Sequence, residues 1–240
     1  MKVSRYKKED NVTYALGATV VMEYLNFAPD KVMGVILHPN FRSEETIEKI
    51  KDINSAKRIQ LTTEEKPFNI LSQKENCFVI GIIKKIPEQI NSGNHVVLVN
   101  PSNAGNMGTI IRSCAGFGIK DIAIITPAVD HFDPKTIRAS MGADAKVNIE
   151  TFDTFEKYQA QFSGNNMYPF MLDGSTLLQE TSIVEPFSLI FGNEATGLPA
   201  EFQKIGNPIR IEHTNNIDSL NLPIAASIAL YESTKSKFTK

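Results

Sequence analysis

The chain has 240 residues, of which 42% are hydrophobic, and a formal net charge of −2 at pH 7. This is enough apolar material for one large domain or two small ones. No apolar run approaches the roughly 18 residues that a membrane helix needs, and the N-terminal stretch lacks the apolar segment of a signal peptide, so we expect a cytoplasmic protein with no membrane association. The near-neutral charge gives no indication of a nucleic-acid partner, because proteins that hold phosphates by bulk electrostatics are usually basic.

Basic residues nonetheless gather near the N-terminus, at Lys2, Arg5, Lys7 and Lys8. Such a run is either a solvated tail or a point of contact with RNA, and the pattern leaves both interpretations open.

The cysteine and histidine patterns do not indicate a metal site. Cys77 and Cys114 lie in apolar segments without a neighbouring cysteine, so we expect two buried thiols in a reducing compartment rather than a disulfide or zinc ligands. The histidines match no catalytic pattern; they are His38, His95, His131 and His213.

The first part of the chain alternates between helical and strand patterns. We expect a helix over residues 15–25, an apolar strand over 31–37 and a helix that begins at Ser43, whose side chain can cap it. A last apolar strand follows over residues 77–85. This order predicts a small α/β domain. Residues 86–94 contain one proline, one glycine and several polar residues, which is typical of a linker. We therefore predict two domains, residues 1–90 with the linker and residues 91–240.

The second domain begins with a strand, a helix and a strand. Residues 95–100 are apolar, residues 109–118 have helical periodicity and residues 121–126 are apolar again, which predicts a βαβ unit. Later segments extend it into an α/β fold with a parallel sheet covered by helices on both faces. These segments are the apolar runs at 168–174, 187–193 and 207–213 and the helical pattern at 151–162.

A final helix is expected over residues 221–236. Ser219 or Asn221 can cap it, and Pro223 falls in its first turn, where a missing N–H costs nothing. The alanines that follow would let another backbone come close, which fits a helix packed against the sheet or against a second subunit. Ordinary core packing explains them equally well.

The first segment that could carry chemistry runs from Asn103 to Arg112 and joins a strand to a helix. Gly105 and Gly108 allow a tight turn, and the N–H groups at a helix start can hold an anionic group. Arg112 follows Gly108 by about one helical turn, so its side chain can return toward the same end of the sheet.

Three interpretations of this segment compete. A dinucleotide site would want G-x-G-x-x-G, whereas the spacing present is G-x-x-G, and a Walker phosphate loop would need a Gly-Lys-Ser or Gly-Lys-Thr that is absent. The third interpretation is a surface arginine after a tight turn.

Two further segments carry polar residues in suitable places. Gly192, Asn193, Glu194 and Gly197 follow an apolar strand, and ligands gather at such strand ends in open α/β sheets. Ser219 and Asn221 point the same way if the chain is extended there, so both could face one ligand. The alternatives are a solvated glycine turn for the first and simple helix capping for the second.

In this order the three segments resemble the signature motifs of the SpoU, or TrmH-type, RNA 2′-O-ribose methyltransferases of the SPOUT superfamily. The motif N-x-G-x-x-x-R is matched from Asn106 to Arg112, the motif with Gly, Asn-Glu and a further Gly from Gly192 to Gly197, and the motif S-L-N by residues 219–221. The match covers residues 93–240. The N-terminal part looks like the ribosomal-protein-like RNA-binding domain that often precedes this catalytic domain.

The resemblance implies a parallel sheet whose C-terminal segment forms a deep trefoil knot, with S-adenosylmethionine as cofactor and RNA as partner. It also implies a homodimer in which Asn106 and Arg112 of one subunit complete the site of the other. The methyl donor would lie in a pocket made by the second and third motifs. By this resemblance the backbone around Ile190–Gly192, Ile211 and Leu220, with Asn193 nearby, should hold adenine and ribose. The residues carried over to the pocket are thus Ile190, Phe191, Gly192, Asn193, Gly197, Ile211 and Leu220.

The implied reaction is attack of a ribose 2′-hydroxyl on the methyl group of the donor. A hydroxyl is a poor nucleophile until its proton is removed or its developing charge is stabilised. A guanidinium group stays protonated at neutral pH, so we expect Arg112 to orient the ribose and stabilise the oxyanion, with Ser219 or an RNA phosphate as candidate proton acceptor. Glu194 is expected to hold the loop or the substrate, and Asn106 and Asn221 to position Arg112 and the ribose. No metal is expected.

The leading hypothesis is an enzyme that methylates RNA, and the expected RNA-binding domain favours ribosomal RNA over transfer RNA. Two alternatives stay open: a non-catalytic RNA-binding or ribosome assembly factor that kept the fold, and a nucleotide-dependent enzyme on a Rossmann sheet.

Overall fold

The computed structural model describes residues 3–71 and 76–238, which form two compact units. Among these residues, one unit contains 3–71, 76–86 and 130–146, and the other contains 87–129 and 147–238. The sequence-based division was a single cut near residue 90. The structure differs from it, because residues 130–146 group with the N-terminal unit, where α5 (Pro134–Ala139) packs against β1 (Val12–Leu16).

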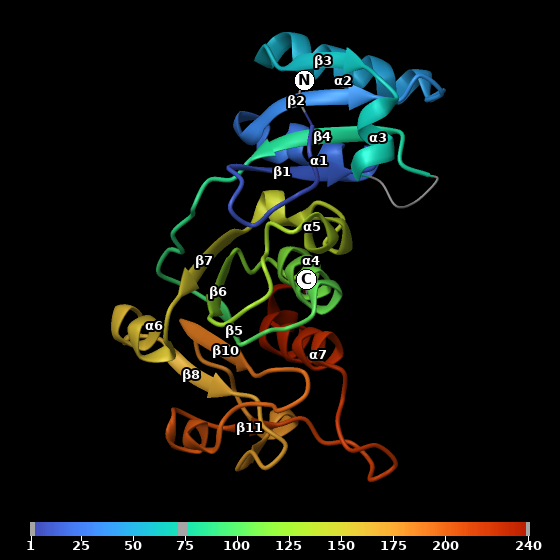
Figure 1. Ribbon diagram of the computed structural model, residues 1–240. Coiled ribbons are helices and arrows are strands. Elements are labelled where there is room, and N and C mark those ends of the chain that lie inside the picture. The colour runs from blue at the N-terminus through green and yellow to red at the C-terminus, as the bar shows by residue number, and fades with distance from the viewer. Residues whose placement is uncertain (1–2, 72–75, 239–240) are drawn as a thin grey trace. The chain divides into compact units, whose positions relative to one another are not determined.

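The N-terminal unit is built on a mixed sheet with strand order β1-β4-β2-β3 (Figure 1). β4 pairs antiparallel with β1 and with β2, and β2 pairs parallel with β3. The remaining elements of this unit are α1 Ala18–Phe27, β2 Val32–Leu37, α2 Glu44–Lys57, β3 Gln60–Thr63, α3 Lys66–Leu71 and β4 Val79–Lys84.

The hydrophobic core of this unit includes a side chain from residues 130–146, which the sequence-based division places in the second domain. Val21 and Tyr24 of α1, Val35 of β2 and Ile50 of α2 pack together, and Ile137 of α5 is fully buried among them. Burying each such side chain stabilises the fold by about 1.5–3 kcal/mol. Residues 130–146 therefore contribute Ile137 to the hydrophobic core of the N-terminal unit, and Ala145 packs against that core.

The prediction of a helix over residues 15–25 was wrong at its start. The stretch Val12–Leu16 forms β1, and Gly17, with a φ of 109°, separates it from α1. The β-branched and aromatic residues of this stretch favour a strand, and its pairing with β4 depends on residues far along the chain. Ser43 does precede α2, but its hydroxyl lies 2.8 Å from Thr46 Oγ1 and caps no backbone N–H.

The second unit contains a parallel sheet with strand order β7-β6-β5-β10-β8, as predicted for the α/β fold. β9 and β11 form a separate small sheet. The strands are β5 His95–Val99, β6 Asp121–Ile125, β7 Asn148–Phe152, β8 Asn166–Pro169, β9 Thr176–Leu177, β10 Phe187–Phe191 and β11 Ile209–Arg210; the helices are α4 Ala104–Gly116, α6 Phe155–Gln161 and α7 Leu222–Thr234. Short 3-10 helices lie at Leu178–Glu180, Ala200–Lys204 and Lys235–Lys237 in this unit, and at Pro29–Lys31 and Ala143–Lys146 in the N-terminal unit.

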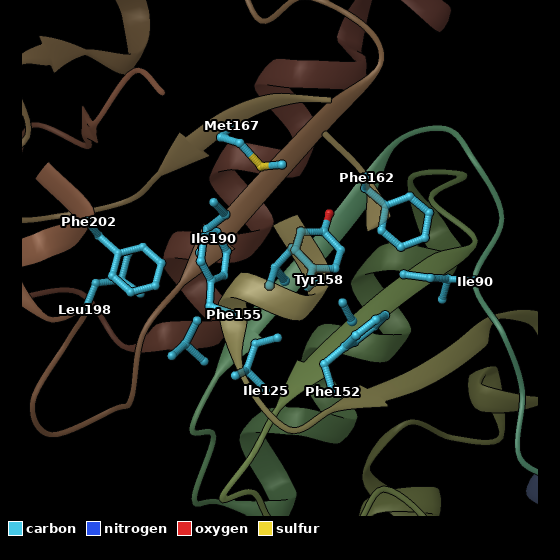
Figure 2. Packing of buried hydrophobic residues seen from close by; sticks show 13 residues of the cluster. Ile90, Ile125, Phe152, Phe155, Tyr158, Phe162, Met167, Ile190, Leu198 and Phe202 are labelled. Carbon is cyan, nitrogen blue, oxygen red and sulfur yellow. The ribbon is translucent and has the colours of Figure 1, made fainter. Parts of the chain in front are cut away.

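Helices cover both faces of this parallel sheet. Figure 2 shows one face, where Phe155 and Tyr158 of α6 and Phe162 pack against Ile125 and Ile190 from the strands. Successive side chains of a strand point to opposite faces, so the neighbouring strand residues face the other layer. On that opposite face of the sheet α4 and α7 pack against each other, and α7 contacts β10.

Two sequence-based expectations for this unit were wrong in detail. Within residues 207–213 only Ile209–Arg210 form a strand, and it pairs with β9 outside the main sheet. The helical pattern over residues 151–162 begins with the end of β7, and α6 starts only after Thr154, whose side chain caps it. In the described residues no helix is both long and apolar enough to cross a membrane.

Candidate active site

The loop after β10 is closed on itself and fixed to the end of β5. Asn193 and Gly197 exchange backbone hydrogen bonds of 3.2 and 2.9 Å. Asn193 Nδ2 donates to the Asn100 carbonyl at 2.8 Å, and Asn193 Oδ1 accepts from the Ala195 backbone N–H at 2.9 Å. Because both ends of the amide are engaged, the Asn193 side chain fixes the shape of the loop beside the cavity that it lines.

Glu194 joins this loop to the start of α4. Its carboxylate accepts hydrogen bonds from Ser102 N at 3.0 Å, Ser102 Oγ at 2.8 Å, Asn103 N at 3.1 Å and Asn106 Nδ2 at 3.3 Å. Asn103 in turn caps α4 by accepting from Asn106 N at 3.0 Å. Partial burial raises the pKa of Glu194, but the hydrogen bonds from Ser102 and Asn106 outweigh it and the pKa lies below its usual value. Glu194 therefore joins the loop after β10 to the residues at the start of α4.

A cavity of about 300 Å³ lies beside this loop. Residues after β8, after β10 and before α7 contribute its walls, so it lies at the C-terminal end of the parallel sheet, where α/β proteins bind ligands. Phe170 and Phe191 stack with their ring centroids 4.7 Å apart and form an aromatic part of the wall. Polar side chains also contribute to the lining, beside its apolar part: Asp173, Asn193, Glu194, Thr196, His213 and Ser219.

Most residues expected to bind the cofactor line this cavity. Ile190 does not, because its side chain is fully buried in the core shown in Figure 2 and its carbonyl accepts a hydrogen bond from Phe170 N at 2.8 Å. From the expected catalytic set, Glu194 and Ser219 also contribute to the wall. The lining residues expected for the cofactor are Phe191, Gly192, Asn193, Gly197, Ile211 and Leu220.

Asn106, Arg112 and Asn221 do not line the cavity of their own chain. Arg112 is exposed on α4 and has no hydrogen-bond or ion-pair partner among residues 3–71 and 76–238. Asn221 is the N-cap residue of α7, but its side chain makes no capping hydrogen bond. Both side chains are therefore available to a molecule outside the chain.

The packing of α4 on α7 places the starts of both helices at the same end. Ser113 Oγ lies 2.9 Å from Ser227 Oγ, and the rings of Phe117 and Tyr231 pack one turn further along both helices. Two contacts with the same offset mean that the helices run parallel. Asn106 and Asn221 lie near the starts of α4 and α7, so both are at the same end of this pair of helices.

Two parts of the cavity wall carry no signal in the sequence. The apolar run over residues 168–174 predicts a strand, but β8 ends at Pro169, and Phe170, Met171 and Asp173 line the cavity. His213 also lines it, with Nδ1 3.0 Å from the Ile211 carbonyl. Among the described residues no group of three or more His, Cys, Asp or Glu side chains is placed to hold a metal ion.

Comparisons with known proteins indicate one family. The model of the SpoU rRNA Methylase family matches residues 93–231. A tRNA (cytidine(34)-2′-O)-methyltransferase of Saccharophagus degradans is 34% identical over 146 residues, which are 58% of this chain and 92% of that protein. The 23S rRNA (guanosine(2553)-2′-O)-methyltransferase RlmP of Bacillus subtilis is 26% identical over 175 residues, which are 70% of this chain and 69% of that protein. The crystal structure of an AdoMet-bound rRNA methyltransferase from Sinorhizobium meliloti has a TM-score of 0.76 and 25% identity, and the match covers 94% of this chain and 88% of that one.

The chemistry of the cavity fits S-adenosylmethionine, the cofactor of this family. Phe191, Leu198 and Leu222 offer apolar surface to a purine and to methylene groups, and the Asp173 carboxylate complements a positively charged sulfonium. The matching segment makes up more than half of the sequence and contains all three polar segments described above. The chain belongs to the SpoU rRNA methylase family.

Proposed function

We propose that this protein transfers a methyl group from S-adenosylmethionine to a ribose 2′-hydroxyl of RNA. The observation that carries the proposal is the cavity at the end of β10, whose loop is tied through Glu194 to Asn106 at the start of α4. The bound cofactor supplies an activated methyl group on a sulfonium. Both relatives described above are named as RNA 2′-O-methyltransferases, which supports the ribose hydroxyl as acceptor.

We assign to Arg112 the binding of the acceptor ribose. Its guanidinium has no partner within the described chain, so its donors are available to orient a ribose and to stabilise the negative charge that develops on the 2′-oxygen. Asn106, held by Glu194, and Asn221 position Arg112 and the ribose. Ser219, which lines the cavity, or an RNA phosphate accepts the proton.

We propose that the active form is a homodimer in which Arg112 and Asn106 complete the site of the partner subunit. Two observations support it. Arg112 does not line the cavity of its own chain, and α7 exposes large side chains at Ile224, Ile228 and Tyr231, which are 52%, 38% and 55% exposed. A second copy of the chain would cover these apolar side chains.

We also propose that the C-terminal segment forms the deep trefoil knot of the SPOUT fold. The supporting observations are the position of β10 between β5 and β8, and the return of α7 to pack on both α4 and β10. This arrangement brings the loop after β10 and the residues before α7 to one cavity.

We propose ribosomal RNA as the substrate and the cytoplasm as the place of action, with the N-terminal unit as an RNA-binding domain. The test supplies methyl-labelled S-adenosylmethionine and, in separate reactions, ribosomal RNA and transfer RNA purified from a strain that lacks this protein. We expect label in ribosomal RNA. Label in transfer RNA alone would contradict the choice of substrate, and absence of label from both would contradict the enzymatic function.

A further inference from the structure

A second cavity, of about 400 Å³, lies wholly within the N-terminal unit. Three cationic side chains line it: Arg5 from the N-terminal segment, and Lys135 and Arg138 from α5. Leu16 and Leu71 contribute apolar surface to the same cavity. Cations beside apolar surface are the combination that a nucleotide needs, because its phosphate is anionic and its base has a flat apolar face.

These cations are not neutralised by the protein. Within the described part of the chain none of the three makes an ion pair, although the protein as a whole is slightly acidic. Asp133 also lines the cavity, but its Oδ1 accepts a hydrogen bond from Lys135 N at 2.8 Å as the N-cap of α5. The carboxylate is held as a cap and offsets one of the three positive charges, so the charged side chains of the lining keep a net charge of +2, three cations less one anion.

The two segments that carry the cations are fixed to each other. Tyr6, next to Arg5, donates its hydroxyl hydrogen bond to Asp130 Oδ2, and Lys85 Nζ donates to Tyr6 Oη at 3.0 Å. Thr136 Oγ1 of α5 donates to the Asp130 carbonyl at 3.1 Å. Asp130 thus connects the N-terminal segment to α5, so that Arg5 is held beside the cations of the helix. Lys2, from the same basic run, lies outside the described residues.

We infer that this cavity binds a nucleotide of single-stranded RNA in the substrate, with Arg5, Lys135 and Arg138 contacting phosphates and Leu16 and Leu71 contacting a base. The inference rests on the proposed function, because it names a recognition site for the RNA that the enzyme methylates. It also gives residues 130–146 a role: they bring two of the three cations to the N-terminal unit.

The test compares the full-length double variant Lys135→Gln/Arg138→Gln with the wild-type protein. The probe is a fluorescein-labelled 12-residue oligouridylate, and affinity is measured by anisotropy between 50 and 300 mM salt. Losing two phosphate contacts should weaken binding by about tenfold at 0.1 M salt and reduce the slope of log Kd against log salt by about 1.4. The matched control is Lys51→Gln/Lys57→Gln, which removes the same charge from exposed positions on α2 and should leave the slope unchanged.

Further readouts separate a local effect from unfolding. The conservative variant Lys135→Arg/Arg138→Lys should keep the salt slope, and every variant should keep the melting temperature and the affinity for S-adenosylmethionine. Lys135→Gln alone changes only an exposed side chain and should produce about half of the slope change. In methyl transfer the double variant should raise KM for RNA and leave kcat unchanged.

Several results would overturn the inference. An unchanged slope in the double variant, or an equal change in the α2 control, would mean that the cavity does not contact RNA. Displacement of the oligouridylate by AMP at equal nucleotide concentration would indicate a site for free nucleotides instead. Either result could be obtained while methyl transfer stays intact, and it would contradict only the inference about the cavity. Conversely, the wild-type protein could bind the probe with the expected salt slope and transfer no methyl group. That result would contradict only the proposed function.

Discussion

Arg112 is the side chain on which the proposed chemistry most depends. We predict that Arg112→Ala lowers kcat by about 10²–10³-fold, the loss expected when one preorganised donor to a developing oxyanion is removed. The affinity for S-adenosylmethionine and the melting temperature should stay the same, because the side chain is exposed and forms no hydrogen bond or ion pair among the described residues. Single-turnover kinetics and a thermal melt check both parts. Lys120→Ala, an exposed cation of the same unit, is the control and should retain full activity.

The residues of the site could be predicted from the sequence to different degrees. Glu194 and Asn193 stand out because they lie beside glycines after a strand, and their contacts show how they shape the loop. The bonds from Ser102 and Asn103 to Glu194 could not be foreseen, because they join positions about ninety residues apart. The family resemblance assigns the backbone around Ile190 to the pocket, but the Ile190 carbonyl accepts a hydrogen bond from Phe170 N and the side chain lies in the core.

At the scale of the elements, the loop after β10 depends on glycine at position 192. A Cβ atom there would lie 2.1 Å from the Gly197 carbonyl carbon, which is backbone and cannot move away without opening the loop. We predict that Gly192→Ala lowers the affinity for S-adenosylmethionine at least tenfold, measured by calorimetry. Gly164→Ala is the matched control, since a Cβ at that exposed turn meets no atom within 4 Å. Equal affinity in both variants would contradict the role of this loop in the cofactor site.

The segment 130–146 is attached to α1 through a buried acid. Burial raises the pKa of Asp144 to about 6, although hydrogen bonds from Tyr24 and from Ser140 Oγ, the latter at 2.9 Å, oppose that shift. An acid with a raised folded-state pKa stabilises the protein fully below its unfolded-state pKa, and this contribution is lost as the pH rises through about 6.

We therefore predict that Asp144→Asn flattens the pH dependence of the free energy of unfolding between pH 4 and 7. The difference between variant and wild type should change by about 2–3 kcal/mol over this range in favour of the variant at the higher pH. Urea unfolding at several pH values measures it, and Asp153→Asn, an exposed carboxylate, is the control. A constant difference across the range would contradict the assigned titration.

Elements with a strong local pattern could be predicted, and elements defined by distant partners could not. The apolar runs that became β5, β6 and β10 and the helical periodicity of α4 and α7 were identified from their spacing. The end of β1, at Ala15 and Leu16, falls within the predicted helix, because the strand depends on pairing with β4. The edge strand β7 has no continuous apolar run, and the attachment of residues 130–146 to the N-terminal unit depends on Ile137 and Asp144, which carry no periodic signal.

At the scale of the whole molecule, the proposed homodimer predicts complementation between two impaired variants, assayed at an S-adenosylmethionine concentration that leaves the Gly192→Ala pocket largely empty. In a heterodimer of Arg112→Ala and Gly192→Ala subunits, the intact donor pocket of the first would receive Arg112 from the second. Random mixing should therefore restore about a quarter of wild-type activity, since half of the dimers carry one complete site. Methyl transfer by the mixture, after subunit exchange, measures it. If Arg112 served the cavity of its own chain, the mixture would stay inactive.

The placement of charge in the folded molecule also bears on how the protein binds RNA. The net charge of −2 gave no indication of a nucleic-acid partner, whereas the structure groups Arg5, Lys135 and Arg138 around one cavity from segments that are far apart in the sequence. A local cluster of unpaired cations can bind phosphates even when the overall charge is slightly negative. Composition therefore could not predict this feature, because it reports the sum of the charges and not their placement.

The central claim is that the ribose of RNA accepts the methyl group under the control of Arg112. The most direct measurement is nucleoside analysis of RNA from a strain lacking this protein, after methylation in vitro with labelled S-adenosylmethionine by the wild type and by Arg112→Ala. We predict label in a single 2′-O-methylated nucleoside with the wild type and its loss with the variant. Label on a base, or undiminished 2′-O-methylation by Arg112→Ala, would contradict this account.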